Sequence, residues 1–462
     1  MEQLAVVLLA AGVGKRMRSN RPKVVHRLGG VPLLEYPLRA ARALSPAKIA
    51  VVVGHGAAEV QRACKGEEVI WVQQNEQLGT GHAVLCTKKS LADFPGHLLI
   101  LNGDVPLITV ETLRRLLGCH RDKRPAVTLL TALLDDPSGY GRVVRDHSGR
   151  IVRVVEDKDA RGAEKSIREV NSGVYVVSPD FLFPALEKLP NQNQQGEFYL
   201  TDIVSEAAQT GVGMEGVCIE EPWEIRGINT REELAIMERY LQEKINRHWM
   251  ESGVTLQDPQ TTYIEEGVEI GKDTVIGPNT HLKGRTVVGE RCLIDGSAYV
   301  MDSRIGRGVH VKFSSAIFES DLGDEAQVGP FAHLRPGTQL GTNVHIGSFV
   351  EVKNSTVGEG TKANHLSYIG DAAVGKDSNI GAGTITCNYD GFDKHRTTIG
   401  DRVQVGSHTQ LVAPVVVEDD AYIAAGSTIT RDVPAGVLAL SRVAQRHVNG
   451  WVERFRQMHK KK

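Results

Sequence analysis

The first residues with a chemical signature form a glycine loop near the start of the chain. Gly12–Arg16, which reads G-V-G-K-R, follows the apolar run Leu4–Leu9, and Arg21–Lys23 adds further positive charge. Glycines let backbone N–H groups approach a phosphate chain, and the cations can neutralise it. Taken alone, such a loop is as compatible with a structural turn as with a ligand site. The loop is therefore a candidate phosphate site that needs support from elsewhere in the sequence.

A second set of polar residues supplies that support. Asp104 follows the apolar run Leu98–Leu101 within the triplet N-G-D. A carboxylate at the carboxyl end of a strand, facing a phosphate loop, suits Mg²⁺. Gln74 and the segment Gly79–His82 provide amides and small residues that can read a base or a ribose. Each is compatible with a polar turn, but three such sites at successive strand ends together predict a nucleotide site.

The C-terminal half holds a different set of candidate residues. Arg335 and Lys353 would stack on each other in a coil of about eighteen residues. Two stacked cations form a phosphate pocket more naturally than a packing feature. A histidine in a repeat protein is usually a surface or packing residue, but His365 lies between Lys353 and Tyr368 and just before an irregular segment at 384–394. The set predicts a second functional site.

Short apolar runs that alternate with amphipathic stretches must position the N-terminal residues. The runs that predict strands are Leu4–Leu9, Ile49–Val53, Leu98–Leu101, Val127–Ala132 and Val174–Val177. Helical patterns lie between them, for example at Thr109–Leu117 and Asp202–Ala208. Apolar strands separated by helices predict a mostly parallel sheet covered on both faces. Such α/β sheets bind ligands at the carboxyl ends of their strands.

A six-residue period must position the C-terminal set. From about Ile264 to Ile429 an aliphatic residue recurs every sixth position, usually followed by a small residue, with phase slips. Three hexads make one turn of a triangular parallel β-helix, with the aliphatic side chains pointing inward and small residues where the backbone bends. Roughly nine or ten such turns fit the tract. A β-sandwich would need a period of two. The period breaks between Ile380 and Ile399, and a loop that leaves a regular repeat often carries function.

A helix connects the two halves. Thr230–Met250 has apolar residues at helical spacing, and Thr230 with Glu233 fits a capping box. We therefore expect an α/β domain at residues 1–228, a linker helix at 229–250 and an all-β domain with a C-terminal tail at 251–462.

The overall composition excludes several classes of protein. The 462 residues carry a net charge of −2 and a sequence pI of about 6.8, so no global field recruits nucleic acid or a membrane surface. No apolar stretch approaches the roughly 18 residues that a membrane span needs. The six cysteines are scattered without a C-x-x-C pair, which suits a reducing compartment. We expect a cytoplasmic protein, and interpret Lys460–Lys462 as a solvated end.

The motifs of both halves occur in the order found in one family. The N-terminal motifs are L-A-A-G-V-G-K-R-M (9–17), R-P-K (21–23), E-Q-L-G-T-G-H-A (76–83), G-D-V-P-L (103–107), G-Y-G-R (139–142), V-E-D-K-D-A (155–160) and N-S-G (171–173). The C-terminal motifs are H-L-S-Y-I-G-D (365–371) and N-I-G-A-G-T-I-T-C-N-Y-D-G (379–391). Over nearly its whole length the chain resembles the bacterial bifunctional N-acetylglucosamine-1-phosphate uridylyltransferases/glucosamine-1-phosphate acetyltransferases.

The resemblance implies a Rossmann-like nucleotidyltransferase domain in which an oxygen of the sugar phosphate attacks the α-phosphorus of UTP and releases pyrophosphate. The residues that would hold the uridine nucleotide are Leu9, Ala10, Ala11, Gly12, Lys23, Gln74, Gly79 and Thr80. Those that would contact the acetylated sugar are Gly141, Glu156 and Asn171. Asp104 and Asn229 would bind Mg²⁺, and the catalytic cations Arg16 and Lys23 would neutralise the triphosphate. Positioning and charge neutralisation would supply most of the rate.

Two residues depart from the family pattern. Lys15 stands where a threonine is common, and Asn102 stands where an aromatic residue can precede the Gly-Asp pair. Either departure could alter nucleotide affinity, but neither removes a catalytic group.

For the C-terminal half the resemblance implies an acetyltransferase. His365 would be the general base that takes a proton from the 2-amine of glucosamine 1-phosphate as it attacks the thioester of acetyl-CoA. Arg335 and Lys353 would bind the sugar phosphate, and Tyr368 and Asn379 the sugar. The residues that would contact acetyl-CoA are Asn388, Tyr389, Ser407, Ala425 and Arg442. The general crossover rule favours a right-handed coil, whereas the family implies a left-handed parallel β-helix and a homotrimer with acetyl-transfer sites between subunits.

The favoured interpretation is therefore acetylation followed by uridylyl transfer, which yields UDP-N-acetylglucosamine for peptidoglycan and lipopolysaccharide precursors. The main alternative is a monofunctional sugar-1-phosphate nucleotidyltransferase with a purely structural β-helix. The cluster of Lys353, His365 and Tyr368 and the loop at Asn388–Tyr389 speak against that alternative. A catalytically inactive scaffold subunit is disfavoured because the N-terminal catalytic residues are all present.

Overall fold

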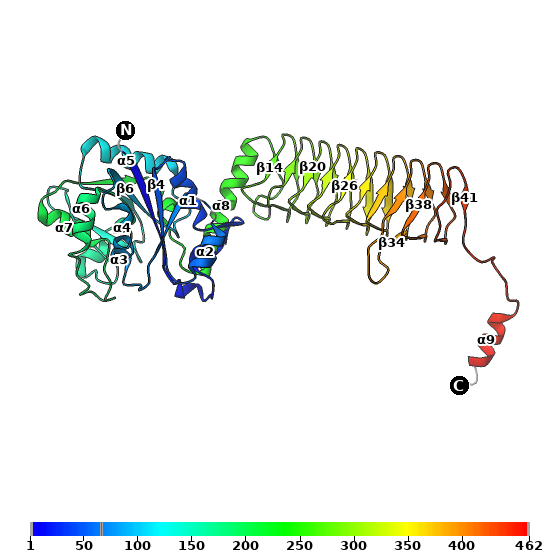
Figure 1. Ribbon diagram of the computed structural model, residues 1–462, viewed down its shortest axis with the longest axis horizontal. Coiled ribbons are helices and arrows are strands. Elements are labelled where there is room, and N and C mark those ends of the chain that lie inside the picture. Colours follow the sequence, from blue (N-terminus) through cyan, green and yellow to red (C-terminus); the bar gives the residue numbers. More distant parts are fainter. Residues whose placement is uncertain (1–2, 65, 67, 460–462) are drawn as a thin grey trace. The chain divides into compact units, whose positions relative to one another are not determined.

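The computed structural model describes residues 3–64, 66 and 68–459, so Lys460–Lys462 lie outside the described residues. The chain forms two compact units, Met1–Arg239 and Tyr240–Lys462 (Figure 1). The boundary between them falls within helix α8 (Arg231–Glu251), the expected connecting helix. The domain boundaries at 228 and 250 stay predictions.

The first unit contains a nine-stranded sheet with the order β11-β7-β10-β6-β1-β4-β5, to which β8 and β9 are added beside β10. The strands are β1 (Gln3–Ala10), β4 (Lys48–Val53), β5 (Val69–Gln73), β6 (Gly96–Asn102), β7 (Val127–Leu133), β8 (Gly141–Arg145), β9 (Ile151–Val155), β10 (Glu169–Val177) and β11 (Met214–Ile219). The short strands β2 (Arg27–Leu28) and β3 (Val31–Pro32) pair separately. Strand β10 runs antiparallel to β6 and β7, whereas β1, β4, β5 and β6 are parallel. The prediction of a mostly parallel sheet is confirmed.

Helices cover both faces of this sheet. They are α1 (Glu35–Arg42), α2 (Ala57–Ala63), α3 (Thr80–Leu85), α4 (Lys88–Leu91), α5 (Val110–Lys123), α6 (Pro179–Leu186) and α7 (Asp202–Thr210). Alternate residues of β1 point to opposite faces, as the period of a strand requires. Val6 packs in a core cluster that includes Leu113 of α5, while Val7 packs in a second cluster with Leu182 of α6. Because both faces are buried, β1 is apolar from Leu4 to Ala10.

The parallel register brings three loops to one edge of the sheet. Leu9 of β1 lies opposite Asn102 of β6, and Ala10 lies opposite Val53 of β4. The chain leaves all three strands at this edge, so the glycine loop and Asp104 meet there. The edge is where an open α/β sheet binds its ligands.

The second unit is a parallel β-helix of stacked coils, and its strands form three long parallel sheets (Figure 1). One sheet runs from β12 (Thr255–Leu256) to β41 (Leu438–Ala439), the second from β13 (Tyr263–Ile264) to β40 (Thr428–Ile429), and the third from β14 (Glu269–Ile270) to β38 (Val415–Val417). The aliphatic residues of the hexads are buried along a single core, as predicted. The stacked coils fit the left-handed form that the resemblance implies.

The small residues after the aliphatic positions have a different physical reason from the one expected. Tight bends were the expected reason, yet the left-handed backbone lies two residues further on, as at Asn343 with φ 57°. At Gly341 an added Cβ would lie 2.7 Å from the backbone nitrogen of Glu359 on the next coil. Glycine is therefore needed for the close approach of neighbouring coils.

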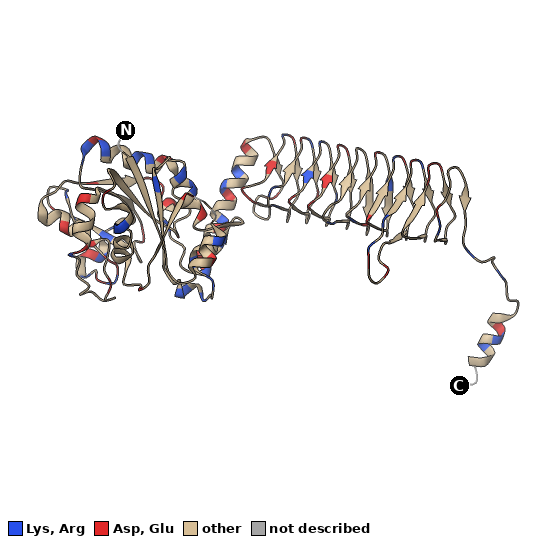
Figure 2. Ribbon diagram, viewed as in Figure 1, with Lys and Arg blue, Asp and Glu red and all other residues tan. Residues whose placement is uncertain are grey.

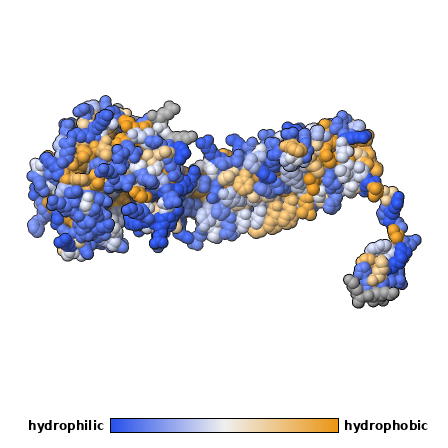
Figure 3. Space-filling view, turned by 60° about the horizontal axis from the view of Figure 1, so that its bottom comes forward, coloured by the Kyte–Doolittle hydropathy of each residue, from blue (hydrophilic) through white to orange (hydrophobic). Residues whose placement is uncertain are grey.

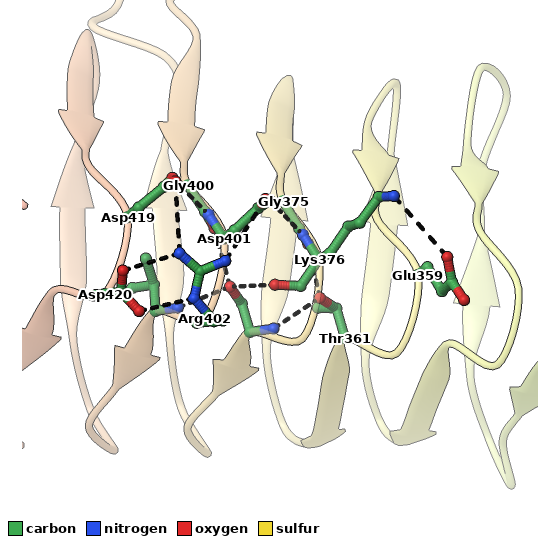
Figure 4. Close-up of polar contacts among 11 residues, drawn as sticks. Glu359, Thr361, Gly375, Lys376, Gly400, Asp401, Arg402, Asp419 and Asp420 are labelled. Carbon is green, nitrogen blue, oxygen red and sulfur yellow. Dashed lines mark hydrogen bonds and ion pairs between the residues drawn. The ribbon is translucent and has the colours of Figure 1, made fainter.

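Polar side chains tie successive coils together at one corner (Figure 4). Asp401 accepts the backbone N–H of Lys376 at 2.7 Å, and Asp419 accepts that of Asp401 at 2.9 Å. Arg402 donates two hydrogen bonds of 2.8 Å to the carboxylate of Asp420. These contacts satisfy backbone donors that the corner leaves outside the sheets.

The break in the period is an insertion in one coil. Asn379 of β33 (Asn379–Ile380) pairs with Gln404 of β36 (Gln404–Val405), whereas Lys362 of β30 (Lys362–His365) pairs with Asn379. The register thus advances by 404 − 379 = 25 residues in this coil, against 379 − 362 = 17 in the coil before. The extra residues form a loop after β34 (Ile385–Cys387), which protrudes from the stack in Figure 1.

Three further features concern the C-terminal helix, the lengths of the helices and the cysteines. Helix α9 (Trp451–His459) has no buried residue. Among the described residues, no helix is both long and apolar enough to cross a bilayer. All six cysteines are free thiols.

Candidate functional site

The glycine loop has separate roles for its two glycines. Gly14 adopts φ 65°, and an added Cβ would lie 2.7 Å from Cβ of Lys23, so this position needs glycine to hold the loop against Lys23. An added Cβ at Gly12 would meet nothing within 4 Å. The backbone at Gly12 therefore borders open space that a ligand can enter. The exposed Lys15 and Arg16 follow in a short 3-10 helix, Lys15–Met17.

Two cavities meet at the carboxyl edge of the sheet. The first, of about 470 Å³, is lined by Leu9, Ala10, Ala11, Gly12, Lys23, Gln74, Gly79 and Thr80, among others. The second, of about 300 Å³, is lined by Arg16, Gly141, Glu156, Asn171 and Asn229, among others. Leu9, Thr80, Asn102 and Asp104 border both. The structure thus places every predicted N-terminal site residue on one of two adjoining cavities, with Asp104 where they meet.

Lys23 links the two predicted metal ligands. Its Nζ forms an ion pair with Asp104 and donates a hydrogen bond of 3.0 Å to Oδ1 of Asn229. Both partners of the ion pair are largely buried, with side-chain exposures of 13% and 21%. The ammonium therefore lies between two oxygens that could hold a cation.

The donor set fits Mg²⁺. The described residues contain no cluster of three or more His, Cys, Asp or Glu that could enclose a metal. Mg²⁺ does not need such a cage, because it binds through one or two carboxylates, water and substrate phosphates. Asp104 and Asn229 supply a carboxylate and an amide oxygen beside the phosphate loop, so they suit a hard cation shared with a nucleotide.

The start of α8 holds Asn229 in place. Oε2 of Glu233 accepts the backbone N–H of Asn229 at 2.5 Å and that of Thr230 at 3.0 Å. The N–H of Glu233 in turn donates to Oγ1 of Thr230 at 3.0 Å, which completes the predicted capping box. The N–H of Ile228 donates to the backbone oxygen of Asp104 at 3.0 Å. These bonds fix the two oxygen ligands relative to each other.

The second cavity is shaped by an irregularity in β10. The pairing of β10 with β7 shifts register between Asn171 and Tyr175. Gly173 has φ 77° there, and an added Cβ would lie 2.4 Å from the side chain of Asn102. The bulge turns Asn171 toward the cavity, which is the usual effect of a bulge beside a site. Asn102 fills the space beside Gly173, so an aromatic side chain is not needed there.

Glu156 is a buried carboxyl group in the same cavity. Its Oε1 accepts a hydrogen bond of 2.9 Å from Oγ1 of Thr201. Burial raises its pKa despite this bond, and the nearby Asp202 adds to the effect. A carboxyl group in this state can accept hydrogen bonds from hydroxyl groups of a sugar.

The far wall of the first cavity carries Gln74, held by two contacts. Its Nε2 donates to the backbone oxygen of Gly79 at 3.1 Å and lies 3.1 Å from Nδ1 of His82. Gly79 has φ 112°, and an added Cβ would lie 2.6 Å from the backbone oxygen of Phe198. Glycine is therefore required at this turn. Oγ1 of Thr80 accepts the N–H of Leu200 at 3.0 Å, which ties the turn to the segment before α7.

In the β-helix the predicted stacking of cations is confirmed. Leu334 of β25 (His333–Leu334) pairs with Val352 of β28 (Glu351–Lys353), which places Arg335 beside Lys353. Arg335 donates to Oε1 of Glu351 at 2.8 Å. Nζ of Lys353 lies 3.6 Å from Oδ2 of Asp371. Each cation thus has one acidic partner.

The inserted loop adds a third cation that the sequence analysis did not assign. The neighbouring Lys353 lowers the pKa of Lys394, which indicates that the two ammonium groups lie close together. Burial raises the pKa of Asp371, but hydrogen bonds from Asn354 and Asn388 and the charge of Lys353 outweigh it and hold the pKa below its usual range. Arg335, Lys353 and Lys394 therefore form a positive cluster with two carboxylates, Glu351 beside Arg335 and Asp371 beside the lysines. An anion with more than one charge can bind to such a cluster.

The loop returns to the coil through its own hydrogen bonds. Nδ2 of Asn388 donates to Asp371 and lies 3.5 Å from the hydroxyl of Tyr368. His395 donates its backbone N–H to Asn388 at 2.8 Å, and its ring contacts Oδ2 of Asp390 at 2.7 Å. Asn388 is buried, whereas Tyr389 is 61% exposed. Cys387 has its pKa raised by burial, which agrees with a structural thiol.

The remaining predicted acetyltransferase residues lie at another corner of the prism. Ser407 and Ala425 each follow a strand of the first sheet, and Nη1 of Arg442 donates to the backbone oxygen of Ala425 at 2.7 Å. His365 ends β30 of the same sheet and is exposed, and Asn379 lies in β33 of the next coil. Within the described part of the chain, no hydrogen bond or ion pair joins these residues to the positive cluster. The structure thus gathers the predicted residues into two groups on either side of the second sheet.

Comparison with known proteins shows the family to which the chain belongs. The fold and the phosphate loop of the first unit define a nucleotidyltransferase, and residues 6–205 match the MobA-like NTP transferase domain. Residues 317–418 match the GMPPB C-terminal domain. The chain is 51% identical to the bifunctional protein GlmU of Pelobacter propionicus, with 99% of this chain and 100% of that protein aligned. It is 50% identical to that of Geotalea uraniireducens, with coverage of 98% and 99%. The chain belongs to the bifunctional GlmU family, which confirms the predicted resemblance.

Proposed function

We propose that this chain makes UDP-N-acetylglucosamine in two steps. The β-helix acetylates glucosamine 1-phosphate with acetyl-CoA, and the α/β unit then transfers a uridylyl group from UTP to N-acetylglucosamine 1-phosphate. The observation that carries the proposal is the presence, in one chain of the GlmU family, of two separate sites that each offer cations for a phosphate group. The competing assignment of a purely structural β-helix leaves the cluster of Arg335, Lys353 and Lys394 without a purpose.

In uridylyl transfer the residues of the α/β unit position the reactants and neutralise charge. The glycine loop and Arg16 bind the triphosphate, and Glu156 and Asn171 orient the sugar in the second cavity. Asp104 and Asn229 would hold Mg²⁺, which supplies positive charge to the phosphate oxygens. Lys23 then contacts the nucleotide phosphates instead of the two oxygens that it now bridges. The sugar-phosphate oxygen attacks the α-phosphorus, and pyrophosphate leaves.

In acetyl transfer the positive cluster binds the phosphate of glucosamine 1-phosphate. Tyr368 and Asn379 contact the sugar, and His365 accepts a proton from its 2-amine. The nitrogen attacks the thioester carbonyl and the C–S bond breaks. The proton that His365 accepted passes to the sulfur, so coenzyme A leaves as the thiol. Acetyl-CoA contacts Asn388 and Tyr389 of the inserted loop and Ser407, Ala425 and Arg442 at the other corner.

We further propose that the acetyl-transfer sites are assembled between three copies of the chain. The support is the division of the predicted residues between two groups that no described contact joins. An apolar ladder formed by the exposed side chains of Phe313, Phe331, Phe349 and Leu366 lies at the same corner as His365. The rings of Phe331 and Phe349 stack at 5.3 Å. Figure 3 shows apolar surface gathered along one side of the β-helix, as expected of a face that packs on another subunit.

The proposal is tested with the intact protein. Incubation with glucosamine 1-phosphate, acetyl-CoA, UTP and Mg²⁺ should give coenzyme A, pyrophosphate and UDP-N-acetylglucosamine, identified by mass. Product from N-acetylglucosamine 1-phosphate alone, without acetylation of glucosamine 1-phosphate, would leave only the monofunctional assignment. Mixing inactive His365→Ala and Lys353→Ala chains tests the assembly, because shared sites regain acetyl transfer and separate sites do not. A cytoplasmic location stays a prediction.

A further inference from the structure

We infer that His82 is a positioning residue that sets which bases the nucleotide site accepts. The inference rests on the proposed uridylyl transfer and concerns a side chain that does not line the nucleotide cavity itself. Its ring lies behind Gln74, which does line that cavity. The role of His82 would be to fix the direction of the Gln74 amide.

The amide of Gln74 is buried, with 3% of the residue exposed, so its orientation depends on its protein contacts. Nε2 has two hydrogens and two neighbours, the backbone oxygen of Gly79 and Nδ1 of His82, both at 3.1 Å. A backbone oxygen only accepts hydrogen bonds, so Gly79 requires the nitrogen of the amide on this side. The second hydrogen of Nε2 can bond to His82 only if Nδ1 of the ring is an acceptor.

A contact on the far side of the ring completes this arrangement. Sγ of Cys86 lies 3.9 Å from Nε2 of His82. When Nδ1 accepts, the proton of the neutral ring is on Nε2, and it points at the sulfur, which is a weak acceptor. Burial raises the pKa of Cys86, so the thiol stays uncharged beside the ring. The chain Cys86–His82–Gln74–Gly79 thus has one consistent direction of donors and acceptors.

The oxygen Oε1 of the Gln74 amide determines which base the site prefers. With Nε2 occupied twice, Gln74 presents Oε1, an acceptor, to a ligand. An acceptor pairs with the N3–H of uracil, whereas cytosine has an unprotonated N3 that repels it. Rotation of the amide by half a turn would present donors and reverse this preference. His82 therefore selects for a base with a ring N–H through Gln74, without touching the base.

A matched pair of substitutions tests the inference in the full-length protein. His82→Leu removes the acceptor, and His82→Asn keeps one, because Oδ1 of asparagine can take the place of Nδ1. A hydrogen bond of this kind is expected to change the preference about fivefold. We expect His82→Leu to raise the KM for UTP and to lower the ratio of kcat/KM for UTP over CTP by about this factor, and His82→Asn to restore both.

Other outcomes overturn the inference in distinct ways. If His82→Leu keeps the wild-type ratio, Gly79 alone orients Gln74. If both variants lose activity for UTP and CTP equally and melt at lower temperature, His82 is only a packing residue. Failure of the wild-type protein to transfer a uridylyl group would instead refute the proposed function, and this control is measured first.

Discussion

The substitution Asp202→Asn tests the electrostatics of the sugar cavity by way of stability. Asp202 begins α7 and is partly buried, and its pKa is raised from 3.8 to about 6, first by burial and then by the charge of Asp159. The folded protein therefore holds a proton on Asp202 at pH values where the unfolded chain has lost it. Stability falls as the pH rises from about 4 to about 6 and is constant above, because the ionised group is disfavoured only in the folded state.

The size of the effect follows from the same values. A pKa that moves from 3.8 to about 6 corresponds to about 3 kcal/mol. Solvent reaches part of the carboxylate, and its place in the first turn of a helix favours the ionised form, so we expect about 1–2 kcal/mol. Asp202→Asn should therefore stabilise the α/β unit by this amount at pH 8 and have little effect at pH 4.

The assay must separate the two units of the chain. The full-length protein is unfolded in urea, and unfolding is monitored by hydrogen exchange in peptides from β7 and β10. Because both strands belong to the α/β unit, this measurement gives the free energy of unfolding of that unit alone. Asp180→Asn is a matched control, because Asp180 also lies in the first turn of a helix (α6) but is exposed. If wild-type and Asp202→Asn proteins keep the same difference in stability at pH 4 and pH 8, the burial argument is wrong.

Three further predictions concern the two sites. Lys394→Met should raise the KM for glucosamine 1-phosphate about tenfold and leave uridylyl transfer unchanged. The control Lys376→Met, at another corner, should change neither. An unchanged KM in Lys394→Met would show that Lys394 does not bind the phosphate. Gly79→Ala should raise the KM for UTP roughly tenfold or more through backbone strain, while Gly149→Ala, which also has a positive φ but open space around it, should not; equal effects would contradict the role of the turn. Glu233→Ala should raise the Mg²⁺ concentration for half-maximal uridylyl transfer about fivefold, because Asn229 loses a hydrogen bond, and the exposed Glu232→Ala should match wild type.

Much of the architecture could be predicted because it depends on local patterns. The strands at Leu4–Leu9 and Leu98–Leu101 are found with slightly wider bounds, as Gln3–Ala10 and Gly96–Asn102, since both are apolar on two faces. The hexad residues are buried because a fixed period leaves the chain one way to form a common core. The strands β8, β9 and β11 were not predicted, because charged residues or glycine interrupt their apolar runs. Strand β5 has the apolar run V-I-W-V, which was not among the predicted strands.

Some residues of the candidate sites could likewise be predicted from the sequence and others could not. Residues of the α/β site follow strands whose order places their ends together, so motif and position agree. Lys394 and Asp371 were not predicted, because they meet only when the inserted loop folds back onto its coil. The hydrogen bond between Asn388 of the loop and Tyr368 joins residues on neighbouring coils, and the length of the insertion does not show which residues of those coils meet. A cation at the end of an insertion was the one available signal for Lys394.

One chain is proposed to carry two independent sites, which catalyse two consecutive reactions. The most direct test compares wild-type, Asp104→Ala and His365→Ala proteins, each incubated with glucosamine 1-phosphate, acetyl-CoA, UTP and Mg²⁺, with products identified by mass. We predict that Asp104→Ala accumulates N-acetylglucosamine 1-phosphate without UDP-N-acetylglucosamine, and that His365→Ala makes UDP-N-acetylglucosamine only when N-acetylglucosamine 1-phosphate is supplied. Full conversion of glucosamine 1-phosphate to UDP-N-acetylglucosamine by either variant would contradict the account.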